Sequence, residues 1–207
     1  MSLQVVQPRI RGFISLTAHP DGCAANVREQ IAAIRAAGLT GSIGTALVVG
    51  SSTGYGLSSA LVAAFGYGAK TLGVCFEKEP SGDKTGTAGW YNVAEAHRLA
   101  TAEGLTYETI NGDAFSEEVK AEAVAALRRL GPVDLLIYSL AAPRRREPDG
   151  TVWNSTLKPI GAPYHGRAFD LRSEEVVETS LEPATDEEIE ATIKVMGGED
   201  WRYWVQM

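Results

Sequence analysis

The stretch Ala46-Leu-Val-Val-Gly50-Ser-Ser-Thr-Gly54-Tyr-Gly56 decides the fold of this chain. Its first four residues form an uninterrupted apolar run, which is typical of a strand buried on both faces. Three glycines follow, and apolar residues then recur at helical spacing from Leu57 to Phe65 until Gly66 and Gly68 end the helix. The stretch therefore predicts a buried strand, a glycine-rich turn and a helix, in that order.

The same alternation of strand and helix continues to about residue 140. Further strands are expected at 71–76, 107–110 and 133–140, and further helices at 91–102 and 116–130. An extended segment at 11–17 and a helix at 23–37 precede them. The short connections favour right-handed crossovers between parallel strands. We therefore expect an α/β fold: a Rossmann-like, doubly wound, mostly parallel sheet with helices on both faces.

The character of the sequence changes after Ala142. Residues 174–200 hold ten acidic residues and one basic residue, and Thr185 with Glu188 forms a capping box for a helix that runs to Met196. No clear strand is expected in this region. We expect residues 1–207 to form one portion of Rossmann type, with an N-terminal extension (1–44) and an irregular, acidic, helical C-terminal segment (143–207).

Composition excludes several classes of protein. With 44% hydrophobic residues the chain can bury a sizeable core, and a net charge of −7 argues against a nucleic-acid groove or a basic membrane surface. The two cysteines are too few for a disulfide framework, and the three histidines show no metal-ligand spacing. No apolar run approaches the roughly 18 residues of a membrane span. These observations indicate a cytoplasmic protein that binds neither metal, membrane nor nucleic acid.

The three glycines after the first strand fit a phosphate-binding turn. A dinucleotide's pyrophosphate needs backbone N–H groups and a helix N-terminus at close range. Gly50 permits the tight turn, Gly54 permits close approach, and Gly56 permits close packing of helix on sheet. The spacing GxxxGxG is the variant found in short-chain dehydrogenases and reductases. The alternative is an ordinary glycine-rich turn, and the context favours dinucleotide binding.

Other residues at strand ends fit the same interpretation. Glu77 ends the second strand, where a carboxylate accepts hydrogen bonds from the adenine ribose and repels a 2′-phosphate. It therefore favours NADH over NADPH, unless Glu77 is simply a solvated residue. Asp113-Ala114 and Ser139-Leu140-Ala141-Ala142 follow the third and fourth strands and are expected at the same sheet edge, on the adenine and nicotinamide sides.

Together these residues match a known family. The sequence resembles the NADH-dependent trans-2-enoyl-CoA and enoyl-acyl-carrier-protein reductases of bacteria, the FabV type within the short-chain reductase superfamily. The matching segments span nearly the whole chain: 8–13, 17–20, 50–56, 86–92 (Gly-Thr-Ala-Gly-Trp-Tyr-Asn), 110–115, 137–140, 143–145, 157–160 and 195–201.

The resemblance implies a cofactor, a substrate class and a set of contacts. The cofactor is NADH, and the substrate partner is an enoyl-CoA or an enoyl-acyl-carrier protein. The run Arg144–Arg146 then either steers phosphates of that partner or is a solvated basic loop. The positions implied to contact NADH are Gly50, Ser51, Ser52, Thr53, Gly54, Tyr55, Phe76, Glu77, Asp113, Ala114, Leu140 and Ala141.

One departure from the family concerns catalysis. The family has a proton-donating tyrosine followed nine positions later by a lysine, and none of the seven tyrosines here has such a lysine. The sequence therefore resembles the amino-terminal part of the enzyme, names no catalytic residue, and predicts no turnover by this chain alone. The alternatives are a non-catalytic NADH-binding module and a carbonyl-reducing short-chain dehydrogenase, whose Tyr-x-x-x-Lys motif is also missing. We expect a monomer.

Overall fold

The computed structural model describes residues 7–11, 14–82, 84–170 and 173–207. The chain forms two compact units, one made mainly by residues 16–140 and the other mainly by residues 141–207. Each unit is described by itself.

A four-stranded parallel sheet lies at the centre of the first unit, with strand order β5-β4-β3-β6. Its strands are β3 (Thr45–Val49), β4 (Lys70–Cys75), β5 (Tyr107–Asn111) and β6 (Leu135–Tyr138). All five residues of β3 are buried, as the apolar run predicts. Val49 pairs with Val74 on one side and Tyr138 on the other, so the strands end along one edge.

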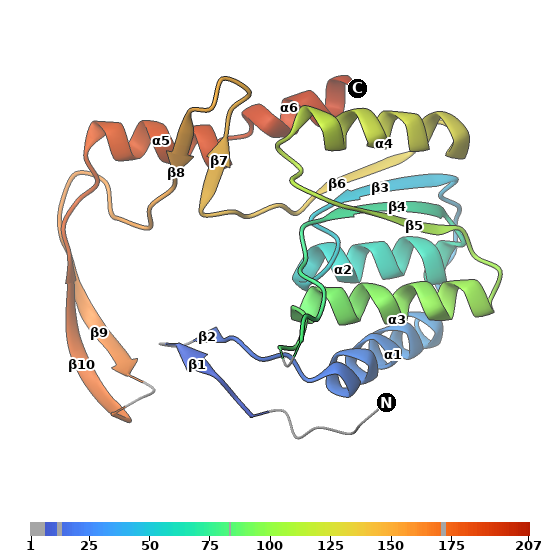
Figure 1. Cartoon of the computed structure of the whole chain (residues 1–207), viewed down its shortest axis with the longest axis horizontal. Coiled ribbons are helices and arrows are strands. Elements are labelled where there is room, and N and C mark those ends of the chain that lie inside the picture. Colours follow the sequence, from blue (N-terminus) through green and yellow to red (C-terminus); the bar gives the residue numbers. More distant parts are fainter. Residues whose placement is uncertain (1–6, 12–13, 83, 171–172) are drawn as a thin grey trace. The chain divides into compact units, whose positions relative to one another are not determined.

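Helices cover both faces of this sheet, which confirms the predicted α/β fold. Figure 1 shows α4 over one face, with α2 and α3 over the other and α1 packed against α3. The bounds are α1 (Pro20–Ala36), α2 (Gly54–Leu61), which continues as the π-helical turn η1 (Val62–Gly66), α3 (Ala88–Ala102) and α4 (Glu117–Leu130).

Local signals explain where two of these helices begin. The side chain of His19 caps α1, because its Nδ1 accepts a hydrogen bond from the N–H of Gly22 at 3.1 Å. This cap and Pro20 start α1 three residues earlier than expected. The hydroxyl of Ser116 caps α4 by accepting a hydrogen bond from Val119 N–H at 3.2 Å, at the residue where the helix was expected to begin.

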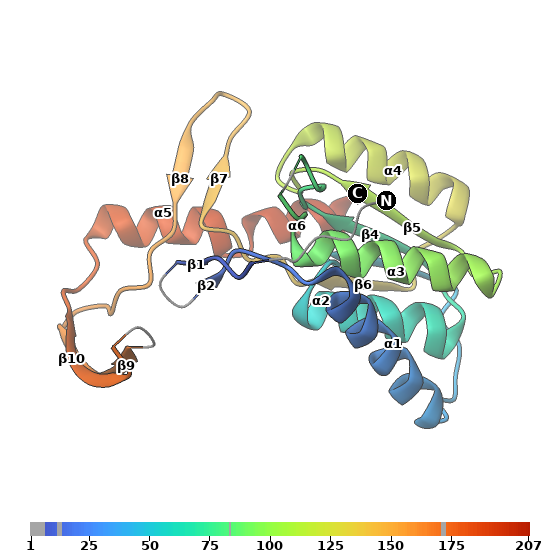
Figure 2. The ribbon, with the colours of Figure 1, turned by 60° about the horizontal axis from the view of Figure 1, so that its bottom comes forward.

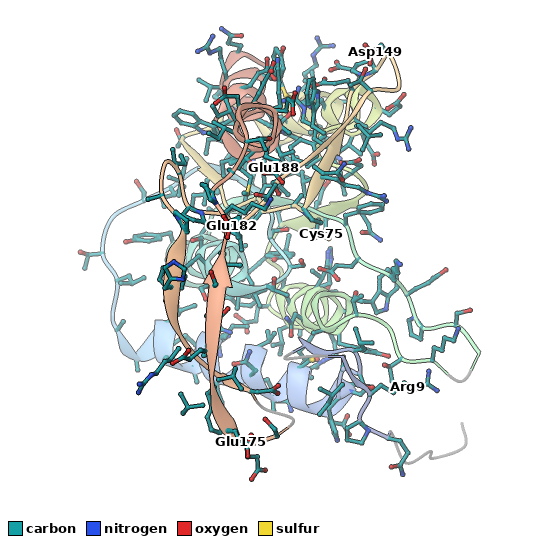
Figure 3. The ribbon with its side chains drawn as sticks, turned by 90° about the vertical axis from the view of Figure 1, so that its left-hand side faces the viewer. Arg9, Cys75, Asp149, Glu175, Glu182 and Glu188 are labelled. Carbon is teal, nitrogen blue, oxygen red and sulfur yellow. The ribbon has the colours of Figure 1, made fainter. Side chains whose placement is uncertain are left out.

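The expectation that no strand follows Ala142 is wrong. The second unit contains two antiparallel hairpins, β7 (Arg144–Arg146) with β8 (Val152–Asn154), and β9 (Tyr164–Asp170) with β10 (Glu175–Leu181). The longer hairpin is largely exposed on both faces, so its sequence lacks the alternation by which a half-buried strand is recognised. Figure 3 shows this hairpin, with Glu175 and Glu182 near its two ends.

The first helix of the second unit follows its sequence signal, and the second was not predicted. α5 (Asp186–Met196) starts at the capping box of Thr185 and Glu188, and α6 (Glu199–Gln206) follows after Gly197-Gly198. The β7–β8 hairpin packs against α5 (Figure 2).

Near the start of the chain, β1 (Ile10–Arg11) pairs with β2 (Ile14–Ser15). Residues 12–13 of the expected extended segment lie outside the described residues. No helix within the described part of the chain is long and apolar enough to cross a membrane.

Both interpretations of Arg144–Arg146 fail for the middle arginine. Arg145 is buried, and its guanidinium donates to the carboxylates of Glu199 at 2.7 Å and Glu147 at 3.1 Å. It also donates to the carbonyl of Lys194 at 2.9 Å. Arg145 therefore ties β7 to the junction of α5 and α6 and is neither a solvated nor a phosphate-steering residue.

Candidate functional site

The glycine-rich loop joins the end of β3 to the start of α2. Gly50 has φ +86°, and a Cβ there would overlap the backbone of Ser139, which follows β6. A Cβ on Gly56 would overlap the carbonyl oxygen of Gly50. Only glycine fits at these two positions, because backbone packs directly on backbone. The loop is thereby held flat against the sheet edge.

Gly54 is different, because it faces open space. It has φ +52°, and a Cβ added there would have nothing within 4 Å. Gly54 is also the first residue of α2, where backbone N–H groups lack partners within the helix. A bare backbone, an open space and a helix N-terminus therefore coincide, which is the arrangement that a bound phosphate needs.

The serines of the loop serve as internal anchors. The N–H groups of Gly50 and Ser51 both donate to the carbonyl of Val74, at 2.8 and 3.0 Å. The Ser51 hydroxyl donates to the same carbonyl at 3.3 Å, and the side chain is fully buried. The buried Ser52 hydroxyl donates to Glu77 Oε1. Both hydroxyls thus stabilise the loop, and Thr53 and Tyr55 are its exposed side chains.

Glu77 follows β4 at the same edge of the sheet. Asn111 holds its backbone on both sides, accepting from the N–H of Glu77 at 2.7 Å and donating to its carbonyl at 3.0 Å. Its half-buried carboxylate lies against Ser52 and Gly89. Phe76, which precedes it, is 76% exposed and therefore offers an apolar face to a ligand.

The ends of β5 and β6 complete the edge. Asp113 accepts a hydrogen bond from Phe115 N–H at 3.0 Å, and the neighbouring Ala114 is buried. Leu140 is half-buried two residues after β6, and Ala141 is exposed at the start of the second unit. In the first unit, the structure thus places the predicted residues after the ends of β3, β4, β5 and β6.

Sequence reasoning missed the residues that support this edge. Asn111 ends β5, and Asn92 of α3 donates to the carbonyl of Ser52 at 3.0 Å. Gly89 touches the carboxylate of Glu77. The segments 86–92 and 110–115 carried the signal, since both match the family, but neither gave any indication of what these residues contact.

Cys75 and His97, two other reactive side chains of this unit, have contacts that fit structural roles. Burial and the nearby Glu77 carboxylate raise the pKa of Cys75 to about 12, so its thiol stays protonated at neutral pH. His97 donates to or accepts from Thr109 Oγ1 at 3.0 Å and stacks edge-on against Tyr107. Within the described residues, no group of three metal-ligating side chains comes together.

Comparison with known proteins gives one consistent family. Residues 5–82 match the NAD(P)H binding domain of trans-2-enoyl-CoA reductase, and residues 84–207 match the trans-2-enoyl-CoA reductase catalytic region. The enoyl-[acyl-carrier-protein] reductase [NADH] of Pseudoalteromonas atlantica is 56% identical over 97% of this chain and 52% of its own length. The chain spans about half the length of the curated relatives it matches.

Solved structures agree with the sequence matches. The trans-2-enoyl-CoA reductase of Treponema denticola in complex with NAD has a TM-score of 0.93 and 45% identity, covering 98% of this chain and 53% of that one. The trans-2-enoyl-CoA reductase of Clostridium acetobutulicum in complex with NADH has a TM-score of 0.90 and 35% identity, covering 98% and 52%. The fold, the loop at its sheet edge and these matches show that this chain belongs to the trans-2-enoyl-CoA reductase family.

Proposed function

We propose that this chain is the NADH-binding part of an enoyl-thioester reductase. The complete enzyme reduces the double bond of a trans-2-enoyl-CoA or an enoyl-acyl-carrier protein, giving the saturated acyl thioester. The observation that carries the proposal is the juxtaposition of the open loop at Gly54 with the fixed carboxylate of Glu77, after the ends of adjacent strands.

The described residues fit the cofactor. The space beside Gly54 accommodates the pyrophosphate against the first amides of α2, and Glu77 accepts hydrogen bonds from the adenine ribose. Asp113 with Ala114 lies on the adenine side, and Leu140 with Ala141 on the nicotinamide side. When bound, NADH supplies a hydride for the β-carbon of the enoyl thioester. This chain's own residues bind and orient it.

The domain boundaries, the cellular compartment and the oligomeric state are also part of the proposal. We take residues 1–207 as the NADH-binding portion, with the extension 1–44 and the C-terminal segment 143–207. Both cysteines are free thiols, which fits action in the reducing cytoplasm. The proposed protein acts as a monomer and engages no nucleic acid, metal or membrane.

Two alternative functions would use the same cofactor site. A carbonyl-reducing short-chain dehydrogenase needs a Tyr-x-x-x-Lys motif that the 207 residues do not contain. A non-catalytic module binds NADH and does no chemistry. The exposed Tyr55 and Phe76 beside the loop suit either a sensor or an enzyme.

Coenzyme titration and steady-state turnover together test the proposal. We expect NADH to quench the protein's tryptophan fluorescence saturably, and a Glu77→Ala variant to bind NADH about tenfold more weakly, since one hydrogen bond to a charged acceptor is lost. Turnover of crotonyl-CoA by a full-length family protein, measured with and without the same substitution, distinguishes a reductase from a non-catalytic NADH-binding module. A parent chain that binds neither coenzyme, or turnover of a ketone but not of crotonyl-CoA, overturns the assignment.

A further inference from the structure

The segment Gly86–Asn92, at the start of α3, supports the sheet edge but has no assigned part in the choice of coenzyme. It nevertheless contacts both halves of that site, the glycine-rich loop and the end of β4. We propose that this segment positions the carboxylate of Glu77 and thereby sets the preference for NADH over NADPH. The inference rests on the proposed function and assigns specificity-determining residues to it.

Thr87 fixes the chain just beyond Glu77. Its N–H donates to the carbonyl of Lys78 at 3.0 Å, and its Oγ1 accepts from the Lys78 N–H at 3.1 Å. Gly86 lies directly under the same carbonyl, where an added Cβ would come within 2.9 Å of the oxygen. Two hydrogen bonds and one close packing contact therefore hold residue 78. Together with the two bonds from Asn111, they fix the backbone on both sides of Glu77.

Gly89 fixes the side chain of Glu77. A Cβ added at Gly89 would overlap the carboxylate of Glu77 and come within 2.7 Å of the Cβ of Ser52. The carboxylate therefore occupies the space that any other residue at position 89 would fill. There it accepts the Ser52 hydrogen bond and lies near the N-terminus of a 15-residue helix, which favours negative charge.

Asn92 connects the same helix to the glycine-rich loop. One turn beyond Gly89, its buried amide donates to the carbonyl of Ser52 at 3.0 Å. Ser52 is thus held by its carbonyl from α3 while its hydroxyl holds Glu77. The first turn of α3 therefore fixes the loop that faces the pyrophosphate and the carboxylate that faces the ribose in one arrangement.

A fixed carboxylate discriminates between the coenzymes better than a mobile one. A glutamate with free torsions can turn away from a 2′-phosphate and avoid the repulsion, and specificity of this kind needs an unfavourable element that cannot relax. Held by Ser52 and Gly89, the carboxylate meets the phosphate in place. The same fixation removes the entropic cost of ordering the side chain when NADH binds.

The test is the ratio of the dissociation constants for NADPH and NADH, measured by fluorescence titration of the 207-residue chain. We expect the parent to favour NADH, Glu77→Ala to abolish most of the preference, and Gly89→Ala to lower the ratio threefold or more. In the Glu77→Ala background, Gly89→Ala should leave the ratio unchanged. Gly104→Ala places the same substitution just beyond the other end of α3, where φ is +69° and the surroundings are open, and should retain the parent's ratio.

The outcomes separate the two proposals. A parent chain that binds neither coenzyme refutes the proposed function itself. If Gly89→Ala binds both coenzymes with the parent's ratio of dissociation constants, the positioning role alone is overturned. The same follows if Gly89→Ala lowers this ratio in the Glu77→Ala background as much as it does in the parent. If circular dichroism shows that Gly89→Ala does not fold, Ser52→Ala removes the hydroxyl donor without adding atoms. An unchanged ratio in Ser52→Ala then overturns the inference.

Discussion

Gly54 carries the sharpest expectation at the scale of single residues. A Gly54→Val variant puts a branched side chain into the open space beside the loop, at φ +52°, where an L-residue costs roughly 1–2 kcal/mol. We expect a modest fall in melting temperature and at least about tenfold weaker NADH binding. Gly68→Val is the matched control, because Gly68 also has a left-handed backbone (φ +67°) and open surroundings but follows η1. Equal NADH affinity in parent and Gly54→Val would mean that the loop is an ordinary turn.

His97 makes stability depend on pH. Burial lowers the pKa of this imidazole below its usual 6.5, although Glu108 opposes the shift. The unfolded chain therefore takes up the proton more readily, and this contribution to stability is present above pH 6.5 and is lost as the pH falls below it. Urea unfolding at pH 7.5 and 5.5 should show a smaller pH effect in His97→Gln than in the parent, by at most about 1.4 kcal/mol per pH unit. Identical pH dependence in the two proteins would contradict this account.

At the scale of elements, Arg145 links β7 to the end of α5. Arg145→Met removes a buried guanidinium that hydrogen-bonds two carboxylates and a carbonyl, and we expect about 1.5–3 kcal/mol less stability. Arg146→Met changes the exposed neighbour on the same strand and should cost far less. Urea unfolding followed by tryptophan fluorescence measures both variants, since three of the four tryptophans lie in the second unit. Equal losses of unfolding free energy in Arg145→Met and Arg146→Met would rule out the proposed link between β7 and the end of α5.

The individual elements show which parts of the fold could be predicted from the sequence. The run Ala46–Val49 and the glycines after it determined the parallel sheet, because burial on both faces and backbone-on-backbone packing leave strong residue preferences. The β9–β10 hairpin was missed because its residues are largely exposed, so its sequence carries no alternation of apolar and polar residues. The contact of Gly89 with Glu77 was missed for another reason. It joins two elements because Gly89 lacks a side chain, and the periodicity of apolar residues gives no signal for such a contact.

At the scale of the whole molecule, cofactor binding and catalysis are expected to separate. A polypeptide of only these 207 residues should bind NADH but should not oxidise it in the presence of crotonyl-CoA. None of its tyrosines has the lysine nine positions later that the family pairs with the proton donor. Tyr107 is in addition buried, which raises the pKa of its hydroxyl and makes it a poor proton donor.

The measurement is absorbance at 340 nm with NADH and crotonyl-CoA. The full-length Pseudoalteromonas atlantica relative serves as the positive control, because it is 56% identical over 97% of this chain. Binding is checked in the same sample by fluorescence, so that a protein that has lost its cofactor site is not mistaken for one that lacks only the proton donor. Saturable NADH binding with no turnover supports the expectation that this chain binds the cofactor but lacks the proton donor. Turnover at the relative's rate would mean that a residue within this chain donates the proton, and the exposed Tyr55, next to Gly54 in the loop, would be the first to change.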